Sequence, residues 1–135
     1  MIMRGVRGAT RVKHNEAAEI LEATRELMAE MIRINGITEE MVASVLFTTT
    51  PDLNAVYPAA AARKVGWHRV ALMGFQEIEA QNGMNMCVRV LIHWNTDKSL
   101  DEITHVYMHD TVKLRPDMYP DNRVVVEESD GGKSS

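Results

Sequence analysis

The chain has a single cysteine, Cys87, among 135 residues. A lone cysteine excludes a disulfide within the chain and suits a reducing compartment. No apolar run approaches the ~20 residues of a membrane span, and Met1 to Gly5 begin no long apolar stretch of the kind a secretory signal needs. We therefore predict a cytoplasmic protein that does not enter a membrane.

Excess positive charge is lacking as well. The net charge of −4 argues against a general binder of nucleic acids or membrane surfaces, so the basic residues that matter act locally. Apolar side chains make up 45% of the chain and charged ones 25%, as in one soluble globular domain with a real core. Periodicity is lost beyond Tyr119. We predict a single domain over residues 1–119 and a C-terminal tail over residues 120–135, disordered from about Ser129.

Several kinds of catalytic machinery are also missing. There is no glycine-rich phosphate loop or Walker motif, and no serine lies in a nucleophile elbow. The five histidines show no metal-ligand spacing with carboxylates or with Cys87. No histidine is placed to activate Cys87, which we interpret as a small core residue. These absences argue against covalent, metal and nucleotide chemistry.

Apolar periodicity predicts two helices among several strands. The longer helix follows a cap at Asn15 and ends at Gly36, and its apolar stripe should cover a sheet. The shorter helix begins at Pro58 and ends at Gly66. Strands are predicted over residues 2–10, 43–50, 67–73, 86–94 and 104–108.

The strand over residues 86–94 is apolar except for Arg89 and His93. Alternation places Arg89 on one face with Cys87, Leu91 and His93, and the opposite face holds Met86, Val88, Val90, Ile92 and Trp94. A guanidinium keeps its charge because its pKa lies above about 12, so it requires an anion or a set of acceptors. Either Glu77 forms an internal salt bridge with Arg89, or a pocket beside Arg89 receives an anionic ligand. The strand alone favours neither.

Three further side chains lie on segments that one sheet could bring together with Arg89. Arg7 stands between glycines at positions 5 and 8, which often mark close approach by another backbone or a ligand; alternatively, Arg7 is solvated on an edge strand. A turn at residues 81–83 would place Glu77 and Arg89 on adjacent antiparallel strands, and Tyr107 lies on the last strand. Two arginines can bind carboxylates bidentately, and a carboxylate and a phenol can orient a hydroxyl. The set suits a small polyanionic ligand and a reaction that needs no nucleophile.

Seven short segments stand out in order along the chain: Met3–Thr10, Thr48–Leu53, Tyr57–Ala59, Gln76–Glu77, Val88–Val90, His105–Tyr107 and Leu114–Asp117. Taken together, they resemble the AroH-class monofunctional chorismate mutases. A single motif such as Arg-Gly-x-Arg-Gly is a weak signal, but the ordered set, with few gaps from Met3 to about Asp117, is specific.

The resemblance implies an α+β fold, with a mixed β-sheet, helices on one face and ferredoxin-like packing. It implies a homotrimer with a pseudo-barrel core, in which sheets pack around the threefold axis and active sites lie in clefts between subunits. The implied reaction is the rearrangement of chorismate to prephenate, in the synthesis of phenylalanine and tyrosine. It needs no cofactor and no metal.

The resemblance also implies roles for individual residues. Arg89 would stand at the ether oxygen of the breaking bond, and Arg7 and Tyr107 would hold the substrate carboxylates. Glu77 would accept a hydrogen bond from the ring hydroxyl. The other substrate-binding residues would line the cleft, with the last two supplied by the neighbouring chain: Met73, Gly74, Phe75, Gln76, Tyr57 and Arg63.

Three positions depart from the family pattern. Ala60 falls where some members carry a lysine, Gly74 where a cysteine can contact the substrate hydroxyl, and Thr104 where relatives carry a basic residue. None removes Arg89, so we expect activity with altered substrate affinity. Two other hypotheses are a small trimeric imine deaminase and a non-catalytic domain that binds an amino acid or carboxylate.

Overall fold

A computed structural model of the chain describes residues 1–81, 83–111 and 123–126. The predicted motif at residues 114–117 and the predicted disorder from Ser129 lie outside this part of the chain. The elements are β1 (Ile2–Arg11), α1 (Ala17–Asn35), η1 (Glu39–Met41), β2 (Val42–Thr49), η2 (Pro58–Ala60), α2 (Ala61–Lys64), β3 (Ala71–Gln76), β4 (Cys87–Thr96), η3 (Leu100–Glu102), β5 (His105–Met108) and β6 (Arg123–Val126).

The strands form one six-stranded mixed sheet in the order β3-β2-β4-β1-β5-β6. β4 runs antiparallel to both of its neighbours, β1 and β2. The other three pairs, β1 with β5, β2 with β3, and β5 with β6, are parallel. α1 connects β1 to β2, and β4 lies between these two parallel strands, so the chain contains a split β-α-β unit of the kind found in ferredoxin-like folds.

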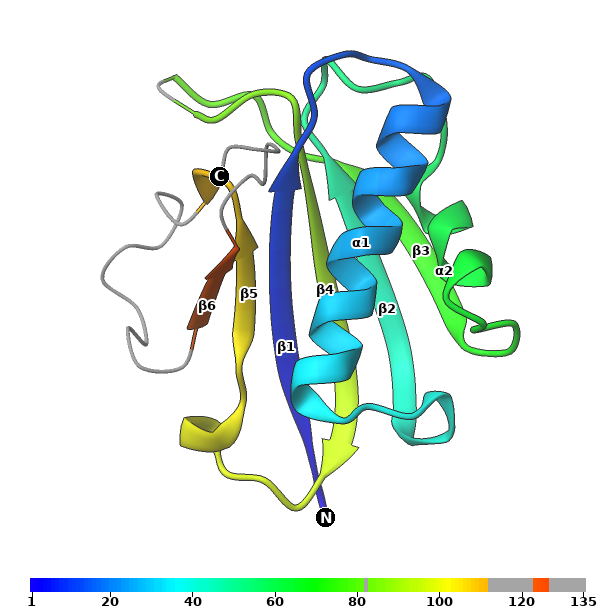
Figure 1. Cartoon of the computed structure of the whole chain (residues 1–135), viewed down its shortest axis with the longest axis vertical. Coiled ribbons are helices and arrows are strands. Elements are labelled where there is room, and N and C mark those ends of the chain that lie inside the picture. The colour runs from blue at the N-terminus through cyan, green and yellow to red at the C-terminus, as the bar shows by residue number, and fades with distance from the viewer. Residues whose placement is uncertain (82, 112–122, 127–135) are drawn as a thin grey trace.

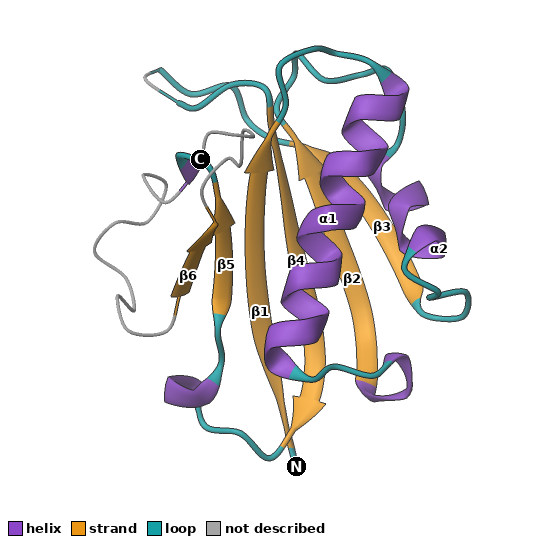
Figure 2. Ribbon diagram, viewed as in Figure 1, coloured by secondary structure: helices purple, strands orange, loops and turns teal. Residues whose placement is uncertain are grey.

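α1 and α2 both lie on one face of the sheet (Figures 1 and 2). The predicted α+β fold, with a mixed sheet and helices on one face, is therefore confirmed. None of the helices in the described residues is long and apolar enough to span a membrane.

The hydrophobic core lies between α1 and this face of the sheet. Leu27, Met28 and Met31 of α1 are completely buried, as are Phe47 of β2 and Ile92 of β4. α1 packs closely on β1 because Gly8 has no side chain: a Cβ at Gly8 would lie 2.4 Å from Sδ of Met31. The close approach predicted from this glycine is made by helix side chains.

The opposite face of the sheet carries no helix among the described residues (Figure 2). The residues that alternate with the core positions point to it, and we call this side the open face. Because β4 alternates between buried and half-buried positions, its Arg89 and Leu91 belong to the open face and its Val90 and Ile92 to the core. Register pairs place Arg7, Leu46 and Thr48 on the open face as well.

The ends of α1 agree with the prediction only in part. Gly36 follows the helix with a left-handed φ of 76° and its N–H donates to the carbonyl of Ile32, as predicted. The predicted cap at Asn15 is wrong, because the residue at the N-cap is Glu16. Oδ1 of Asn15 instead accepts hydrogen bonds from the backbone N–H groups of Asn54 and Ala55. Asn15 thus holds the loop that precedes η2.

The third strand begins later than predicted. Residues 67–70 precede β3, and Trp67 is buried in the core instead of lying on a strand. The carboxylate of Glu39 accepts hydrogen bonds from the backbone N–H groups of Arg69 and Val70, at 2.6 and 2.8 Å. These two N–H groups are therefore not available for strand pairing, and β3 begins only at Ala71.

β6 lies in the segment that was predicted to be a C-terminal tail, residues 120–135. Its backbone pairs in parallel with β5, from His105 opposite Arg123 to Met108 opposite Val126. This strand was not predicted, although the three consecutive valines at positions 124–126 are β-branched residues of the kind enriched in strands.

Candidate active site

Arg89 lies in the middle of the sheet, on β4, opposite Ala9 of β1 and Thr48 of β2. Its guanidinium forms a bidentate ion pair with Glu77: Nε donates to Oε2 at 2.8 Å and Nη2 donates to Oε1. The side chains of Arg89 and Glu77 are 34% and 14% exposed. The pair is therefore partly shielded from water but still reachable.

The predicted placement of Glu77 and Arg89 on adjacent antiparallel strands is wrong. Glu77 is not on a strand adjacent to β4; it directly follows β3, and β3 pairs in parallel with β2. β2 therefore lies between the two, and the Glu77 side chain reaches across it to Arg89. The backbone N–H of Glu77 donates to the carbonyl of Thr49 at 2.9 Å, which fixes the backbone from which this side chain extends.

Thr48 stands at the centre of this arrangement, opposite Phe75 on one side and Arg89 on the other. Its hydroxyl donates a hydrogen bond to Oε2 of Glu77. Thr48 was named only as the first residue of the Thr48–Leu53 segment and was not a predicted site residue, although alternation along the strand places it on the same face as Leu46. Threonine is common in strands, so nothing in its type marked it as part of a site.

The protein environment keeps both members of the pair ionised. Burial by itself would raise the pKa of Glu77, but hydrogen bonds from Arg89 and Thr48, with the charges of Arg89 and Arg7, outweigh it and lower that pKa. The hydrogen bond to Glu77 likewise raises the pKa of Arg89. The site therefore holds a fixed carboxylate beside a fixed cation.

A pocket of about 560 Å³ opens beside the pair on the open face. Its lining residues are Arg7, Leu46, Thr48, Phe75, Glu77, Ile78, Arg89, Val90 and Leu91. Two arginines against one glutamate leave this lining with a net positive charge. Nη1 of Arg89 has no hydrogen-bond partner within the described ranges. The predicted salt bridge between Arg89 and Glu77 is therefore present, and Arg89 also lines a pocket of net positive charge.

Arg7 is held in this pocket by β5. Its guanidinium carbon lies 5.9 Å from the centre of the Tyr107 ring, and Tyr107 is buried. The backbone N–H of Arg7 donates to Nδ1 of His105 at 3.0 Å. Burial, together with the positive charge of Arg7, lowers the pKa of His105, so His105 is kept neutral as an acceptor. The structure thus brings Arg7 and Tyr107 together as predicted.

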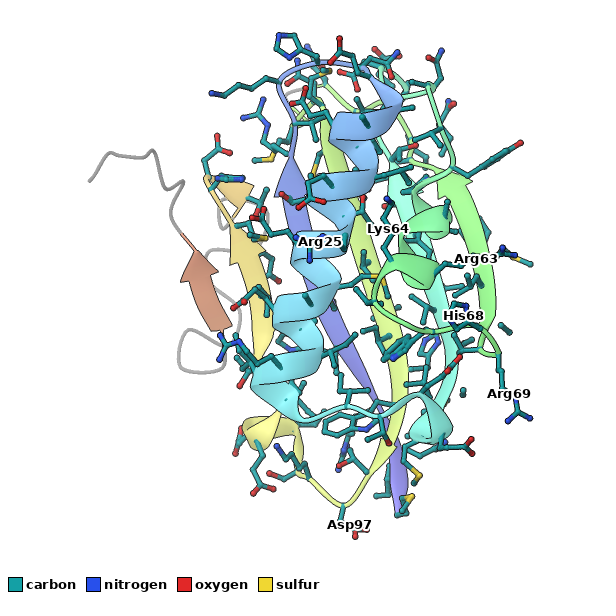
Figure 3. All side chains as sticks on the ribbon, turned by 45° about the vertical axis from the view of Figure 1, so that its right-hand side comes forward. Arg25, Arg63, Lys64, His68, Arg69 and Asp97 are labelled. Atoms are coloured by element: carbon teal, nitrogen blue, oxygen red, sulfur yellow. The ribbon has the colours of Figure 1, made fainter. Side chains whose placement is uncertain are left out.

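A second pocket of about 560 Å³ contains the other predicted residues. It is lined by Thr49, Leu53, Asn54, Ala55, Val56, Tyr57, Pro58, Gly74, Phe75 and Gln76. Phe75 lines both pockets, so β3 separates them. Met73 lies on β3 and is 58% exposed. Arg63 is exposed on α2 near Lys64 and lines neither pocket (Figure 3). Within one chain, Tyr57 and Arg63 are therefore not brought together with Arg89.

The Thr50-Pro51-Asp52 turn anchors the start of β4. The hydroxyl of Thr50 donates to Asp52 at 2.6 Å and accepts from the backbone N–H of Cys87 at 2.9 Å. Asp52 also accepts from the N–H of Met86, whose φ of 52° is left-handed. Burial raises the pKa of Cys87 to about 12, so this residue stays a neutral thiol, in agreement with its interpretation as a core residue.

One group of possible metal ligands occurs away from this site. Ligand atoms of His14, Glu16 and Glu19 lie within 4.8 Å of one another, whereas no metal-ligand spacing was predicted for the histidines. The Glu19 carboxylate already accepts hydrogen bonds from the backbone N–H groups of Lys13 and His14 and contacts the His14 ring. These contacts explain the group as part of the turn that leads into α1.

The fold and the site together define a class of protein: a small α+β protein whose sheet carries a pocket of net positive charge, lined by Arg7 and Arg89. A family model described as chorismate mutase type I matches residues 3–118. Chorismate mutase AroH of Thermus thermophilus is 43% identical over 118 residues, which cover 87% of this chain and 97% of that protein. Chorismate mutase AroH of Bacillus subtilis (strain 168) is 41% identical over 119 residues, covering 87% and 94%.

A solved structure agrees with the sequence comparisons. The chorismate mutase from Clostridium thermocellum superposes with a TM-score of 0.78 at 44% identity, and the match covers 80% of this chain and 96% of that one. The chain belongs to the chorismate mutase type I family. It is accordingly an enzyme of the isomerase class, and the predicted family is confirmed.

Proposed function

We propose that the chain rearranges chorismate to prephenate in the open-face pocket, for the synthesis of phenylalanine and tyrosine, without a cofactor. One observation carries the assignment of the site: Arg89 is fixed by Glu77 at a positively charged pocket large enough for a small dicarboxylate. In the reaction, the ether carbon–oxygen bond lengthens before the carbon–carbon bond forms, and negative charge grows on the ether oxygen. Arg89 stands at this oxygen.

Arg89 accelerates the reaction because its charge matters most in the transition state. A fixed cation binds an oxygen with growing negative charge more strongly than the neutral ether of the substrate, and only such differential binding lowers the barrier. The ion pair with Glu77 holds the guanidinium in place before substrate arrives, so little reorganisation is needed at the moment of reaction.

The other residues position the substrate. Arg7 and Tyr107 hold the carboxylates, and Glu77 accepts a hydrogen bond from the ring hydroxyl. These contacts select the compact chair conformer, which the free molecule adopts rarely, and so remove part of the barrier by positioning. The low pKa of Glu77 supports its role, because an ionised carboxylate is purely an acceptor.

We further propose a homotrimer in which each cleft is shared between two subunits. Two observations support it. Tyr57, Gly74 and Gln76 lie in one pocket and Arg7 and Arg89 in another, so a complete cleft requires the second pocket to come from a neighbour. The open face also exposes large apolar side chains, including Met73 and Phe75 at 58% and 47%. Packing three such faces around an axis would cover them and form the pseudo-barrel core.

Residues 1–119 are the proposed extent of the catalytic domain, with the family match over residues 3–118 in its support. We place the enzyme in the cytoplasm, which suits a chain with one buried cysteine. Neither an imine deaminase nor a non-catalytic amino-acid-binding domain is favoured by any observation above.

The activity is tested by following the loss of chorismate ultraviolet absorbance with the purified chain, with prephenate identified as the product. No conversion above the uncatalysed rate would overturn the proposal. Light scattering is expected to give three chains per particle, and a fully active monomer would exclude a shared cleft.

A mixing experiment tests the shared cleft directly. Chains carrying Arg89→Ala and chains carrying Arg63→Ala are co-expressed, and each variant is also expressed alone as a control. In mixed trimers some clefts combine an intact Arg89 with an intact Arg63, so activity should exceed the sum of the two controls. No such recovery would mean that both residues act within one chain.

A further inference from the structure

We propose that Thr48 is a positioning residue that fixes Glu77 so that its one open acceptor position, on Oε1, is presented to a hydroxyl group of the ligand. This inference rests on the proposed function and assigns a specificity-determining role to a residue whose hydroxyl donates to Glu77. Its basis is the hydrogen-bond arrangement around the Glu77 carboxylate.

The carboxylate of Glu77 has about four acceptor positions, two on each oxygen. Oε2 uses both of its positions, one for Nε of Arg89 at 2.8 Å and one for the Thr48 hydroxyl. Oε1 uses one, for Nη2 of Arg89. Among the described residues no other donor reaches the carboxylate, so the single open position is on Oε1.

Thr48 is what makes the two oxygens different. Arg89 alone approaches the carboxylate symmetrically, with one donor to each oxygen, and would leave one open position on each. The Thr48 hydroxyl closes the position on Oε2. Since Glu77 lines the pocket, a ligand hydroxyl can then donate only to the open position on Oε1. Without Thr48, the open positions on Oε1 and Oε2 would compete for it.

Consecutive residues of β2 hold Glu77 at both ends. The carbonyl of Thr49 accepts the backbone N–H of Glu77 at 2.9 Å, and the hydroxyl of Thr48 holds the tip of its side chain. Glu77 follows an edge strand that has no neighbour beyond it among the described residues. Without Thr48, only Arg89 would hold the carboxylate.

The test compares Thr48→Val, which keeps the shape and loses the hydroxyl, with Thr48→Ser, which keeps the hydroxyl. Once the chair conformer is bound, a contact to a non-reacting hydroxyl is equal in the ground state and the transition state, so its loss raises KM and leaves kcat unchanged. We expect Thr48→Val to raise KM about 10-fold, the size of one hydrogen bond to a charged group, and Thr48→Ser to stay within about twofold of the parent.

Two further readouts separate positioning from a structural role. With a substrate analogue that lacks the ring hydroxyl, Thr48→Val and the parent should have equal KM. Thr48→Val should also move the acid limb of the kcat/KM profile to higher pH, because the Thr48 hydrogen bond is one of the causes that lower the pKa of Glu77. An unchanged KM for chorismate, or an equal loss with the analogue, would overturn the inference.

Three controls accompany the test. Thr10→Val makes the same chemical change on β1, where the buried hydroxyl has no hydrogen-bond partner among the described residues, and should leave KM and kcat unchanged. If Thr48→Val does not fold, the pair Thr48→Ala and Thr48→Ser still isolates the hydroxyl. Arg89→Ala is measured alongside: if it keeps normal turnover, the proposed function fails, whereas an inactive Arg89→Ala with an unchanged Thr48→Val rejects the role of Thr48 alone.

Discussion

The two faces of the sheet are built from the same strands but differ in what they hold. On the helix-covered face, β2 and β4 contribute side chains such as Phe47 and Ile92, which are completely buried. On the open face, the residues next to them, Thr48 and Leu91, are half-buried and lie beside a charged pair. Alternation along a strand separates the two sets.

This comparison shows where stability and function are encoded. Each fully buried aliphatic or aromatic side chain on the covered face contributes about 1.5–3 kcal/mol. The open face instead places Arg89 where its desolvation has to be offset by Glu77. A change on one face should therefore affect unfolding, and a change on the other should affect turnover, even when the two residues are neighbours in sequence.

The largest expected effect comes from Arg89→Ala on the open face. Loss of the cation that we propose to stand at the ether oxygen should lower kcat by about 10³-fold or more, as for other groups that stabilise charge in a transition state, while far-ultraviolet circular dichroism stays unchanged. Steady-state kinetics with chorismate measure this loss. Turnover within about tenfold of the parent would contradict the role assigned to Arg89.

The next effect contrasts two glycines of β1 that lie on opposite faces. Gly8→Ala should lower the free energy of unfolding by about 1–3 kcal/mol by overpacking, because the new Cβ meets Met31 and Leu27 in the core. Gly5→Ala is the matched change on the open face, where the nearest atom is Cδ1 of Leu91 at 3.3 Å, and should cost less. Urea unfolding measures both, and equal losses would remove the contrast between the faces.

The smallest effect is a pH dependence at His105. Burial and the charge of Arg7 lower its pKa in the folded state, so below the unfolded pKa of about 6.5 the unfolded chain binds the proton first. The contribution of His105 to stability is therefore complete above that pH and is lost as the pH falls toward the folded value.

His105→Asn isolates this effect from the other histidines. Its Oδ1 can take the place of Nδ1 as acceptor for the Arg7 backbone N–H, but it does not titrate. Urea midpoints between about pH 7.5 and 5 should fall less for His105→Asn than for the parent. Parallel curves would show that His105 does not contribute to the pH dependence.

Local patterns predicted the parts of the fold that depend on local physics. Alternation correctly placed Arg89 and Val90 on opposite faces of the sheet. Gly36 ends α1 because a residue with left-handed φ is needed there. The composition of a segment and its neighbours along the chain suffice for such features.

The missed features all depend on contacts between distant segments. A turn at residues 81–83 indicated a hairpin between Glu77 and Arg89, but β3 pairs with β2 instead. Trp67 looked like the start of a strand, yet the Glu39 carboxylate holds the next residues out of the sheet. Thr48 became recognisable as part of the site only when three strands were placed side by side.

The position of Glu77, one residue beyond β3, constrains how the length of this chain can vary. Met73, Phe75 and Glu77 are alternate residues and therefore point to the same face of the sheet, the open face. Inserting or deleting a single residue between them would turn the Glu77 carboxylate toward the helix-covered face. The same change just before Ala71 or well after Glu77 would leave the ion pair intact. Length differences among related chains should therefore fall outside residues 71–77, in the connections on either side.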